Sequence, residues 1–332
     1  MTSSAPPPSP SSGPTASSIA QAAAQLRQGD LVAFPTETVY GLGANATDDQ
    51  AVARIFEAKG RPRFDPIIVH LADPNELHSV TASVSDDARQ LADAFWPGPL
   101  TMVLPRSDSI PPIVSAGLPT VGVRVPDHPI ASQLIEMAGC PIAAPSGNRF
   151  GCISPTTAEH VREQLADRVQ VILDGGPCRV GVESTVLDMT SDTPRLLRPG
   201  GVTREELEEV VGSVEVFEGA QPVDQAAPAP GMLARHYAPS TPVKLLAELP
   251  TTVPPCSGLL VFSTPEITDG WAHLEVLSRD GDLVEATAGF FAALHRLDGH
   301  NLQQIIALPF PNHGLGTALN NRLNRAATQA QS

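Results

Sequence analysis

The sequence predicts an α/β protein with two domains, and three observations support this prediction. Apolar, strand-like segments alternate with helix-like segments from about residue 19 onward. A chain of 332 residues is long for a single hydrophobic core. Between residues 218 and 230 the composition shifts to Pro, Ala, Gln and Gly, as in linkers. We therefore expect an α/β domain over residues 19–212, a linker over 213–240 and a second domain over 241–328.

Residues 1–18 are nearly all Ser, Pro, Ala, Thr and Gly. Such a segment buries too little apolar surface to fold, so we expect a disordered tail. It also lacks the basic start and apolar centre of a signal peptide. No apolar run in the chain is long enough to span a bilayer, so we expect a cytoplasmic protein without membrane contact.

The larger domain begins with alternating helices and strands. The run Thr47-Asp48-Asp49-Gln50 is typical of a capping box that starts a helix, and Gly60 marks the end of that helix. Ser85 caps the next helix, which Pro97 stops. The expected helices cover residues 19–28, 47–59 and 85–95, and the expected strands cover residues 31–34 and 67–71.

The rest of the larger domain continues this mixed order. Two more capping boxes begin at Thr156 and Thr203. The expected helices cover residues 128–138, 156–166 and 203–211, and the expected strands cover residues 100–104, 120–125, 141–144 and 169–173.

The second domain has a simpler pattern of strands linked by helices. Such a pattern favours a small, mostly parallel, Rossmann-like sheet. The expected strands cover residues 243–246, 258–262, 274–277 and 304–308, and the expected helices cover residues 283–297 and 316–328.

The charge balance argues against a protein whose main task is to grip nucleic acid. Lys and Arg together number 21 against 36 Asp and Glu, for a net charge of −15. Binding to nucleic acid depends mainly on neutralising phosphates, so we expect no stable binding of this kind. A local basic pocket for a small anion is compatible with this balance. The four cysteines have no Cys-x-x-Cys spacing, which disfavours a zinc site, and we expect no protein-bound metal.

Two cations separated by a glycine, Lys59 and Arg61, are the first candidate site residues. They lie where a helix passes into a loop restrained by Pro62 and Pro66. Solvated charges at a helix end would explain them equally simply. Fixed cations are nevertheless what a triphosphate requires.

Polar residues at strand ends form further candidates. Ser146 and Asn148 follow the strand that ends near Ala144, at the edge where open α/β sheets bind ligands, although the same residues are typical of a turn. Arg124 lies in an apolar strand, where an arginine needs a bound carboxylate or a buried acid. His70 also ends a strand, where a structural histidine is the more common interpretation.

Three later segments remain open on composition alone. Ser184 could be an ordinary strand hydroxyl, and Arg198 could simply flank a helix near Glu205 and Glu206. The run Arg235-His236-Tyr237 at the end of the linker could fold over a ligand or merely anchor the linker.

Taken together, these segments closely resemble the threonylcarbamoyl-AMP synthase family, whose catalytic domain is called YrdC-like. Each motif is weak alone, but the set follows the family's order and spacing over about residues 19–328. The matching segments are residues 35–43, Lys59-Gly60-Arg61-Pro62, 66–70, 95–101, 120–124, 144–148, 154–157, 181–186 and 197–201, with 229–239 and 314–322 matching the longer, two-domain members. The resemblance implies a YrdC-like twisted mixed sheet with helices, followed by the smaller Rossmann-like domain.

The resemblance also implies a reaction, in which ATP, L-threonine and bicarbonate give threonylcarbamoyl-adenylate and pyrophosphate. Other proteins, the tRNA threonylcarbamoyltransferases, then pass the threonylcarbamoyl group to adenosine in tRNA. By motif position, Lys59 and Arg61 would be catalytic. The nucleotide side would comprise Lys59, Arg61, Asp65, Thr120, Ser146, Asn148, Ser154, Arg198 and Tyr237. The threonine side would comprise Thr36 or Thr38, His70, Arg124, Ala144 and Ser184.

Asp65 departs from the Asn that is common at its position in relatives. An acid near the phosphates could weaken nucleotide binding, or it could pair with Arg63. No acidic cluster of metal-binding type stands out, so we expect Mg²⁺ to arrive with ATP.

Two other function classes compete with the adenylate-forming enzyme. A non-enzymatic RNA-binding or ribosome-maturation module is disfavoured by the net charge of −15. An ATP-dependent carbamoyl transfer to another acceptor occurs in larger hydrogenase-maturation relatives, but their zinc-finger and acylphosphatase segments are missing from this sequence. The second domain is expected to anchor the linker as a lid.

Overall fold

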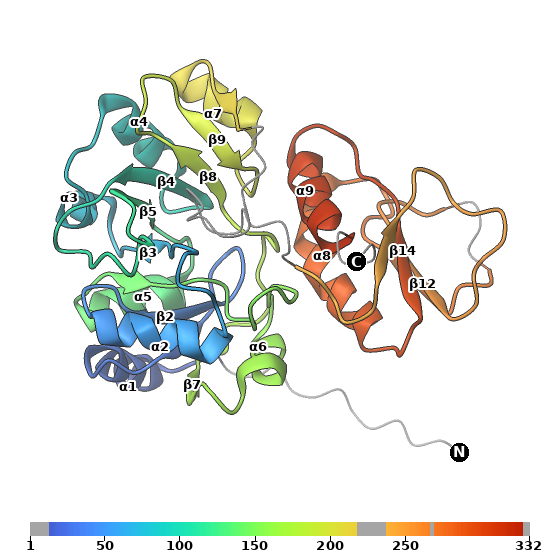
Figure 1. Ribbon diagram of the computed structural model, residues 1–332, viewed down its shortest axis with the longest axis horizontal. Helices are drawn as coiled ribbons and strands as arrows, with labels where there is room; N and C mark the ends of the chain where they lie inside the picture. Colours follow the sequence, from blue (N-terminus) through green and yellow to red (C-terminus); the bar gives the residue numbers. More distant parts are fainter. Residues whose placement is uncertain (1–12, 218–236, 266–268, 328–332) are drawn as a thin grey trace.

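The computed structural model describes residues 13–217, 237–265 and 269–327. Residues 218–236, which include most of the predicted linker with Arg235 and His236, lie outside the described residues. The described chain forms two sheets that belong to two separate parts of the sequence (Figure 1).

The first part contains a ten-stranded mixed sheet with the order β10-β9-β8-β4-β5-β3-β6-β2-β1-β7. The sheet contains both parallel and antiparallel strand pairs, as expected for a mixed sheet. Its strands are β1 (Val32–Phe34), β2 (Gly41–Asn45), β3 (Val69–His70), β4 (Leu100–Pro105), β5 (Thr120–Arg124), β6 (Ile142–Ala143), β7 (Val171–Ile172), β8 (Thr185–Asp188), β9 (Arg195–Arg198) and β10 (Glu215–Val216).

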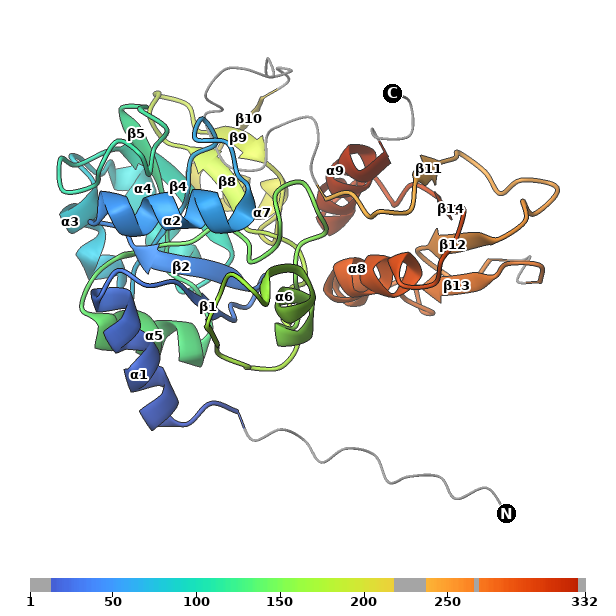
Figure 2. The same cartoon turned by 60° about the horizontal axis from the view of Figure 1, so that its bottom comes forward.

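Helices cover both faces of this sheet, because successive strand residues point to opposite sides. Val32 and Phe34 of β1 pack in a cluster with α1 (Ala16–Arg27) and α5 (Pro129–Ala138), whereas Ala33 packs in the cluster that contains α2 (Asp49–Lys59). Figure 2 shows α1 and α5 on one side of β2 and α2 on the other. The remaining helices of this part are η1 (Pro74–Glu76), α3 (Leu77–Val80), α4 (Asp86–Phe95), α6 (Ala158–Leu165) and α7 (Arg204–Val211).

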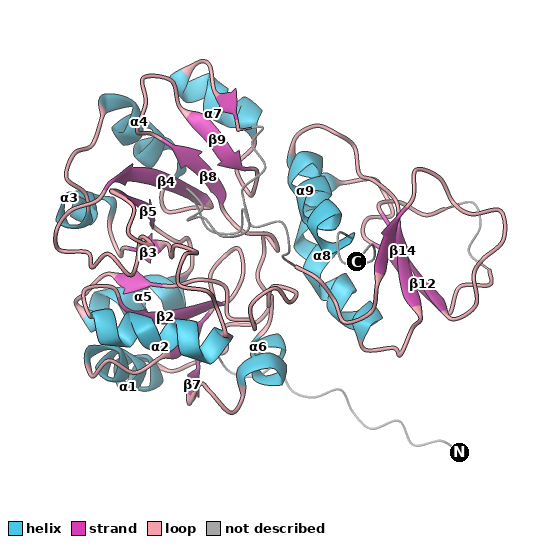
Figure 3. Cartoon of the chain, viewed as in Figure 1, coloured by secondary structure: helices cyan, strands magenta, loops and turns pink. Residues whose placement is uncertain are grey.

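The second part is a four-stranded sheet in which every pair is parallel, as the sequence predicts. The strand order is β11-β14-β12-β13. Its elements are β11 (Val243–Leu245), β12 (Ser257–Val261), β13 (His273–Val276), α8 (Leu283–Asp298), β14 (Gln304–Ala307) and α9 (Leu315–Ala327). Both helices lie between this sheet and the first domain (Figure 3).

The two domains share one apolar cluster. Phe290 and Phe291 of α8 pack in the same cluster as Val39 and Val182 of the first domain. The loop before β8 also approaches α8 closely at Gly181. A Cβ added at Gly181 would lie 2.5 Å from the carbonyl oxygens of Thr287 and Ala288, so only glycine fits there. The domain interface is therefore packed like a protein interior.

Several predicted boundaries need correction. The helix expected to start at residue 47 is capped by Asp48, not Thr47, because the Asn45 side chain accepts the Thr47 amide and hydroxyl hydrogens. The next predicted box at Thr156 is likewise shifted, since Thr157 is the N-cap. Helix α1 starts at Ala16, so the end of the predicted tail is helical.

Other local predictions are confirmed. Gly60 ends α2 in the left-handed conformation with a φ of 63°. Ser85 caps α4, and Thr203 with Glu206 forms a complete capping box at α7. The pattern missed β2, β8, β9 and β10. The glycines of β2 are dictated by packing. A Cβ on Gly43 would come within 2.8 Å of Phe34 and Ile142.

None of the helices in the described part of the chain is long and apolar enough to cross a bilayer.

Candidate active site

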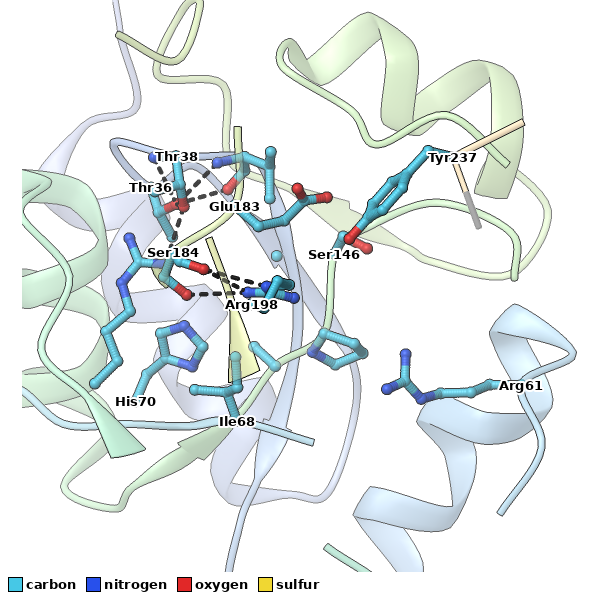
Figure 4. Close-up of a pocket in the computed structure, with 15 residues that line it drawn as sticks. Thr36, Thr38, Arg61, Ile68, His70, Ser146, Glu183, Ser184, Arg198 and Tyr237 are labelled. Carbon is cyan, nitrogen blue, oxygen red and sulfur yellow. Dashed lines mark hydrogen bonds between the residues drawn. The ribbon is translucent and has the colours of Figure 1, made fainter. Parts of the chain in front are cut away.

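A pocket opens where several strand ends and loops of the first domain meet Tyr237. Its lining is Thr36, Thr38, Val39, Gly41, Arg61, Ile68, His70, Arg124, Ala144, Pro145, Ser146, Glu183, Ser184, Arg198 and Tyr237. Figure 4 shows Thr36, Thr38, His70 and Ser184 toward one end, Arg61 and Tyr237 toward the other, and Arg198 between them. The pocket thus has a hydroxyl-rich end and a cationic end.

The hydroxyl-rich end is preoriented by the loop between β1 and β2. The Thr36 hydroxyl donates to the Val39 carbonyl at 2.7 Å and lies 2.8 Å from the Thr38 hydroxyl. Thr38 in turn accepts a hydrogen bond from Arg124 Nη1 at 2.9 Å. Both predicted threonines therefore line the pocket in a fixed chain of hydrogen bonds, before any ligand arrives.

Arg124 has the buried acid that the sequence left as one of two alternatives. Its Nη2 lies 2.6 Å from Glu37 Oε2, and the two residues are only 3% and 1% exposed. Arg124 Nε also donates to the Gly98 carbonyl at 3.2 Å. Glu37 was not among the predicted site residues, although it stands between Thr36 and Thr38 in the same motif.

His70 presents a neutral ring to the pocket. Burial lowers the pKa of His70 to about 3, and the nearby Arg124 charge acts in the same direction. Among the described residues, Nδ1 of His70 has no hydrogen-bond partner. A neutral imidazole at this place can exchange a hydrogen bond with an amine or hydroxyl without adding charge.

Arg61 supplies a fixed cation at the other end of the pocket. Its Nη2 lies 2.9 Å from Asp65 Oδ2 and donates to the Pro66 carbonyl at 2.7 Å. The predicted alternative that Asp65 pairs with Arg63 is therefore wrong. Burial raises the pKa of the Asp65 carboxyl, and the positive charges of Arg61 and Lys59 oppose that rise. Asp65 does not line the pocket, so it orients Arg61 from behind.

Lys59 also lies behind the pocket surface. Its ammonium donates to the carbonyls of Ser146 and Asn148, each at 2.5 Å. Burial lowers the pKa of Lys59 well below its usual value, with Arg61 adding to the effect. Asn148 is likewise turned inward, since its amide donates to the carbonyls of Arg149 and Cys152. The two residues shape the loop that presents Ser146.

A second arginine, Arg198, extends the cationic side of the pocket toward its middle. It donates to the Ser184 carbonyl through Nη2 at 2.8 Å and through Nε at 3.2 Å. The Ser184 hydroxyl lies 2.8 Å from that of Thr101. Both predicted residues line the pocket. Ala144 lines it as well, next to Ser146.

The wall next to Arg198 depends on the second domain. Glu183 Oε1 accepts the Ser154 hydroxyl at 2.5 Å, and Glu183 Oε2 lies 3.0 Å from Arg322 Nε on α9. The Arg322 guanidinium carbon lies 5.5 Å from the centre of the Tyr237 ring, which is fully buried. Ser154 therefore stands behind the wall and does not line the pocket.

Thr120 is the predicted residue that the structure separates from the others. Thr120 and Arg124 are the two ends of β5, which places them about 13 Å apart at ~3.3 Å per residue. Arg124 lines the pocket and Thr120 does not. Strand membership alone did not distinguish the two ends of β5.

Family models match the chain almost from end to end. A model described as telomere recombination (Sua5_yciO_yrdC) matches residues 24–200. A model described as threonylcarbamoyl-AMP synthase, C-terminal domain, matches residues 202–328.

Relatives and solved structures of similar length agree with these models. A threonylcarbamoyl-AMP synthase of Bacillus subtilis is 45% identical over 320 residues, covering 93% of this chain and 92% of its own. The crystal structure of Pyrococcus abyssi Sua5 complexed with L-threonine superposes with a TM-score of 0.88 at 42% identity, covering 95% of each chain. A putative threonylcarbamoyl-AMP synthase of Mycobacterium tuberculosis is 42% identical over 194 residues, covering 58% of this chain and 89% of its own.

Proposed function

The chain belongs to the threonylcarbamoyl-AMP synthase family, and we propose that it converts ATP, L-threonine and bicarbonate into threonylcarbamoyl-AMP, pyrophosphate and water. The observation that carries the proposal is the division of one pocket into two chemically different ends. The end with Arg124 and His70 suits an amino acid, and the end with Arg61 and Arg198 suits phosphates.

At the amino-acid end, Arg124 lines the pocket, and its three nitrogens contact Thr38, Glu37 and the Gly98 carbonyl. Each Nη atom carries a second hydrogen, and we expect these hydrogens to meet the threonine carboxylate. The neutral ring of His70 and the hydroxyls of Thr36 and Thr38 would take hydrogen bonds from the substrate amine and hydroxyl.

The proposed reaction has two steps. The amine of threonine and bicarbonate form a carbamate with loss of water. The carbamate oxygen then attacks the α-phosphorus of ATP, the bond to the β-phosphate breaks, and pyrophosphate carries the electrons away. Charge therefore builds on pyrophosphate, where Arg61 and Arg198 would stabilise it. The proposed reaction class is thus nucleotidyl transfer, and no protein nucleophile is needed.

Magnesium would enter as part of the substrate. Glu183 is the carboxylate among the described lining residues, and Ser154 and Arg322 already engage both of its oxygens. We propose that phosphates and water hold the ion of the Mg²⁺–ATP complex, which suits the preference of Mg²⁺ for oxygen ligands and retained water.

The product fits a place in tRNA modification. An acyl-adenylate of this kind is an activated carrier, so a separate tRNA threonylcarbamoyltransferase would accept it.

Labelled bicarbonate tests the proposal directly. With ATP and threonine present, label should enter an adenylate and pyrophosphate should be released in equal amount. If the rate of pyrophosphate release by folded protein does not depend on threonine, the proposed function is contradicted.

Two arginines of one loop provide a matched pair of variants. Arg61 lines the pocket, whereas Arg63 is exposed. In an Asp65→Asn background, which avoids an unpaired buried acid, Arg61→Gln should lower kcat by about 10²-fold or more. Arg63→Gln should leave it unchanged.

A further inference from the structure

The segment Ser154–Thr156 supports Glu183 from behind the pocket wall. The Pro155 carbonyl accepts the Tyr40 amide at 2.8 Å, and the Thr156 carbonyl accepts the Cys178 amide at 2.9 Å. These two bonds attach the segment to the first domain. Its remaining polar contacts come from two histidines and from Glu183.

One of these histidines belongs to the second domain. His295 of α8 lies with Nε2 3.1 Å from the Ser154 carbonyl. A carbonyl can only accept, so Nε2 carries the hydrogen and donates. The Ser154 hydroxyl then donates to Glu183 at 2.5 Å. Two hydrogen bonds, joined through the covalent structure of Ser154, therefore connect α8 to a side chain of the pocket wall.

The other histidine, His160 of α6, contacts the same segment from the first domain. Its Nδ1 accepts the Thr156 amide hydrogen at 3.3 Å, so the hydrogen of the neutral ring is on Nε2. The rings of His160 and His295 stack across the domain interface, with centroids 3.7 Å apart and planes 14° from parallel. The stack fixes the plane of the His295 ring and so aims its Nε2 at Ser154.

Both rings are held neutral by their surroundings. Burial lowers the pKa of His160 to about 4, and His295 and Arg296 add to the effect. Burial also lowers the pKa of His295, against the opposing effects of Ser154 and Asp298. Arg296 is engaged with Glu275, and Asp298 accepts the amides of residues 240 and 241. The groove beside the stack also contains Arg149 and Glu163.

We propose that His295 is a positioning residue for the pocket: from the second domain it fixes Ser154, and through Ser154 it fixes the orientation of Glu183. The kinetic part of this inference rests on the proposed function. The part that concerns the ordering of residues Ser154–Thr156 rests only on the hydrogen bonds and ring stacking described above.

The test replaces His295 by Phe, which keeps an aromatic ring in the stack and removes the Nε2 donor. Loss of one hydrogen bond to a buried carbonyl should raise KM for ATP about tenfold while kcat changes little. Amide hydrogen exchange in peptides containing Tyr40 and Cys178 should become faster, because the carbonyls that accept their amides, those of Pro155 and Thr156, lie in the loosened segment. His295→Gln provides an amide donor and should restore both measurements toward wild type.

A second stacked pair in the same domain provides the control. His273 of β13 and His300 stack with centroids 3.3 Å apart and planes 12° from parallel, away from the pocket. His300→Phe should therefore leave both KM for ATP and the exchange of those peptides unchanged.

Three results would overturn the inference. These are an unchanged KM and exchange in His295→Phe, a failure of His295→Gln to differ from His295→Phe, and an equal effect of His300→Phe. If wild-type protein forms no threonylcarbamoyl-AMP, the proposed function fails, and the exchange of the segment in the same variants still decides the positioning role.

Discussion

The two ends of the pocket are supported in different ways. At the end that contains Arg124 and His70, the polar contacts of Arg124 come from Glu37, Thr38 and Gly98 of the first domain, with Glu37 Oε2 at 2.6 Å. The wall that contains Glu183 is tied to the second domain through Arg322 and, by way of Ser154, His295. The comparison teaches that different parts of one binding site can be held in place by different domains. Substitutions in each domain should therefore affect the binding of a different substrate.

The largest effect is expected from breaking the support within the first domain. Arg124→Leu leaves Glu37 buried without its cation and should destabilise the protein by about 3–5 kcal/mol. Threonine should then fail to stabilise the protein against unfolding, whereas ATP should still do so. Denaturant unfolding with and without each substrate measures both effects.

The Glu37→Gln/Arg124→Leu double variant is the control for the buried charge. It should recover part of the lost stability without recovering threonine binding. Equal stability of the single and double variants would show that the loss of stability in Arg124→Leu does not come from the unpaired charge of Glu37.

The second effect concerns the support from the second domain. Arg322→Met removes the partner of Glu183 and should raise KM for ATP by roughly 10-fold or more, with a smaller change for threonine. Steady-state kinetics with each substrate varied in turn will measure the difference. Arg296→Met removes an exposed ion pair with Glu275 in the same domain and should change stability by less than about 1 kcal/mol. A change confined to threonine in Arg322→Met would reverse the assignment of the two ends.

The third effect is a dependence of stability on pH. The pKa values of His70 and His160 are lowered from 6.5 to about 3 and about 4, and that of His295 is also lowered. Below pH 6.5 these histidines therefore bind protons in the unfolded chain but stay unprotonated in the folded protein. The contribution of these histidines to stability should be constant above about pH 7 and should fall as the pH drops from 6.5 toward 4, by about 1–2 kcal/mol per buried histidine at pH 5.

Urea unfolding at several pH values can separate the contribution of His70 from that of the stacked pair, His160 and His295. The His160→Gln/His295→Gln double variant keeps the His70 contribution and should show a shallower fall. If the slope is identical to that of wild type, the stacked pair does not contribute.

The smallest effect comes from a site that touches neither end of the pocket. Thr203→Ala removes the capping box of α7 and should lower stability by about 1 kcal/mol. KM for both substrates should stay as in wild type. A kinetic change in this variant would mean that global stability, rather than local support, determines the behaviour of the other variants.

The sequence was sufficient for the fold class because its periodicities are strong. The parallel second sheet follows from strands separated by helices, and Gly60 and Thr203 follow from local capping rules. The short, glycine-containing β2 was missed because Gly43 is required by the close approach of Phe34 and Ile142, which are distant from it in the sequence. Capping residues were misplaced by one position where two candidates were adjacent.

The candidate site was predictable to a similar degree and for similar reasons. Arg61, His70, Arg124, Ser146, Ser184 and Arg198 do line one pocket, although their ligands stay a prediction. The sequence did not distinguish residues that face the pocket from residues that shape it, such as Lys59, Asn148 and Ser154. It also missed the partners Glu183 and Arg322, because no pattern links an acid in one domain to an arginine 139 positions away.

The apolar cluster shared by the two domains has a consequence during synthesis. Val39, Ile153 and Val182 leave the ribosome well before Phe290, Phe291 and Leu319, against which they pack. At ~5–20 residues per second, the first domain would wait roughly 5–20 s for these side chains. During that interval it presents an apolar patch of the kind that chaperones recognise. The order of translation therefore exposes the newly made enzyme to aggregation until its second half arrives.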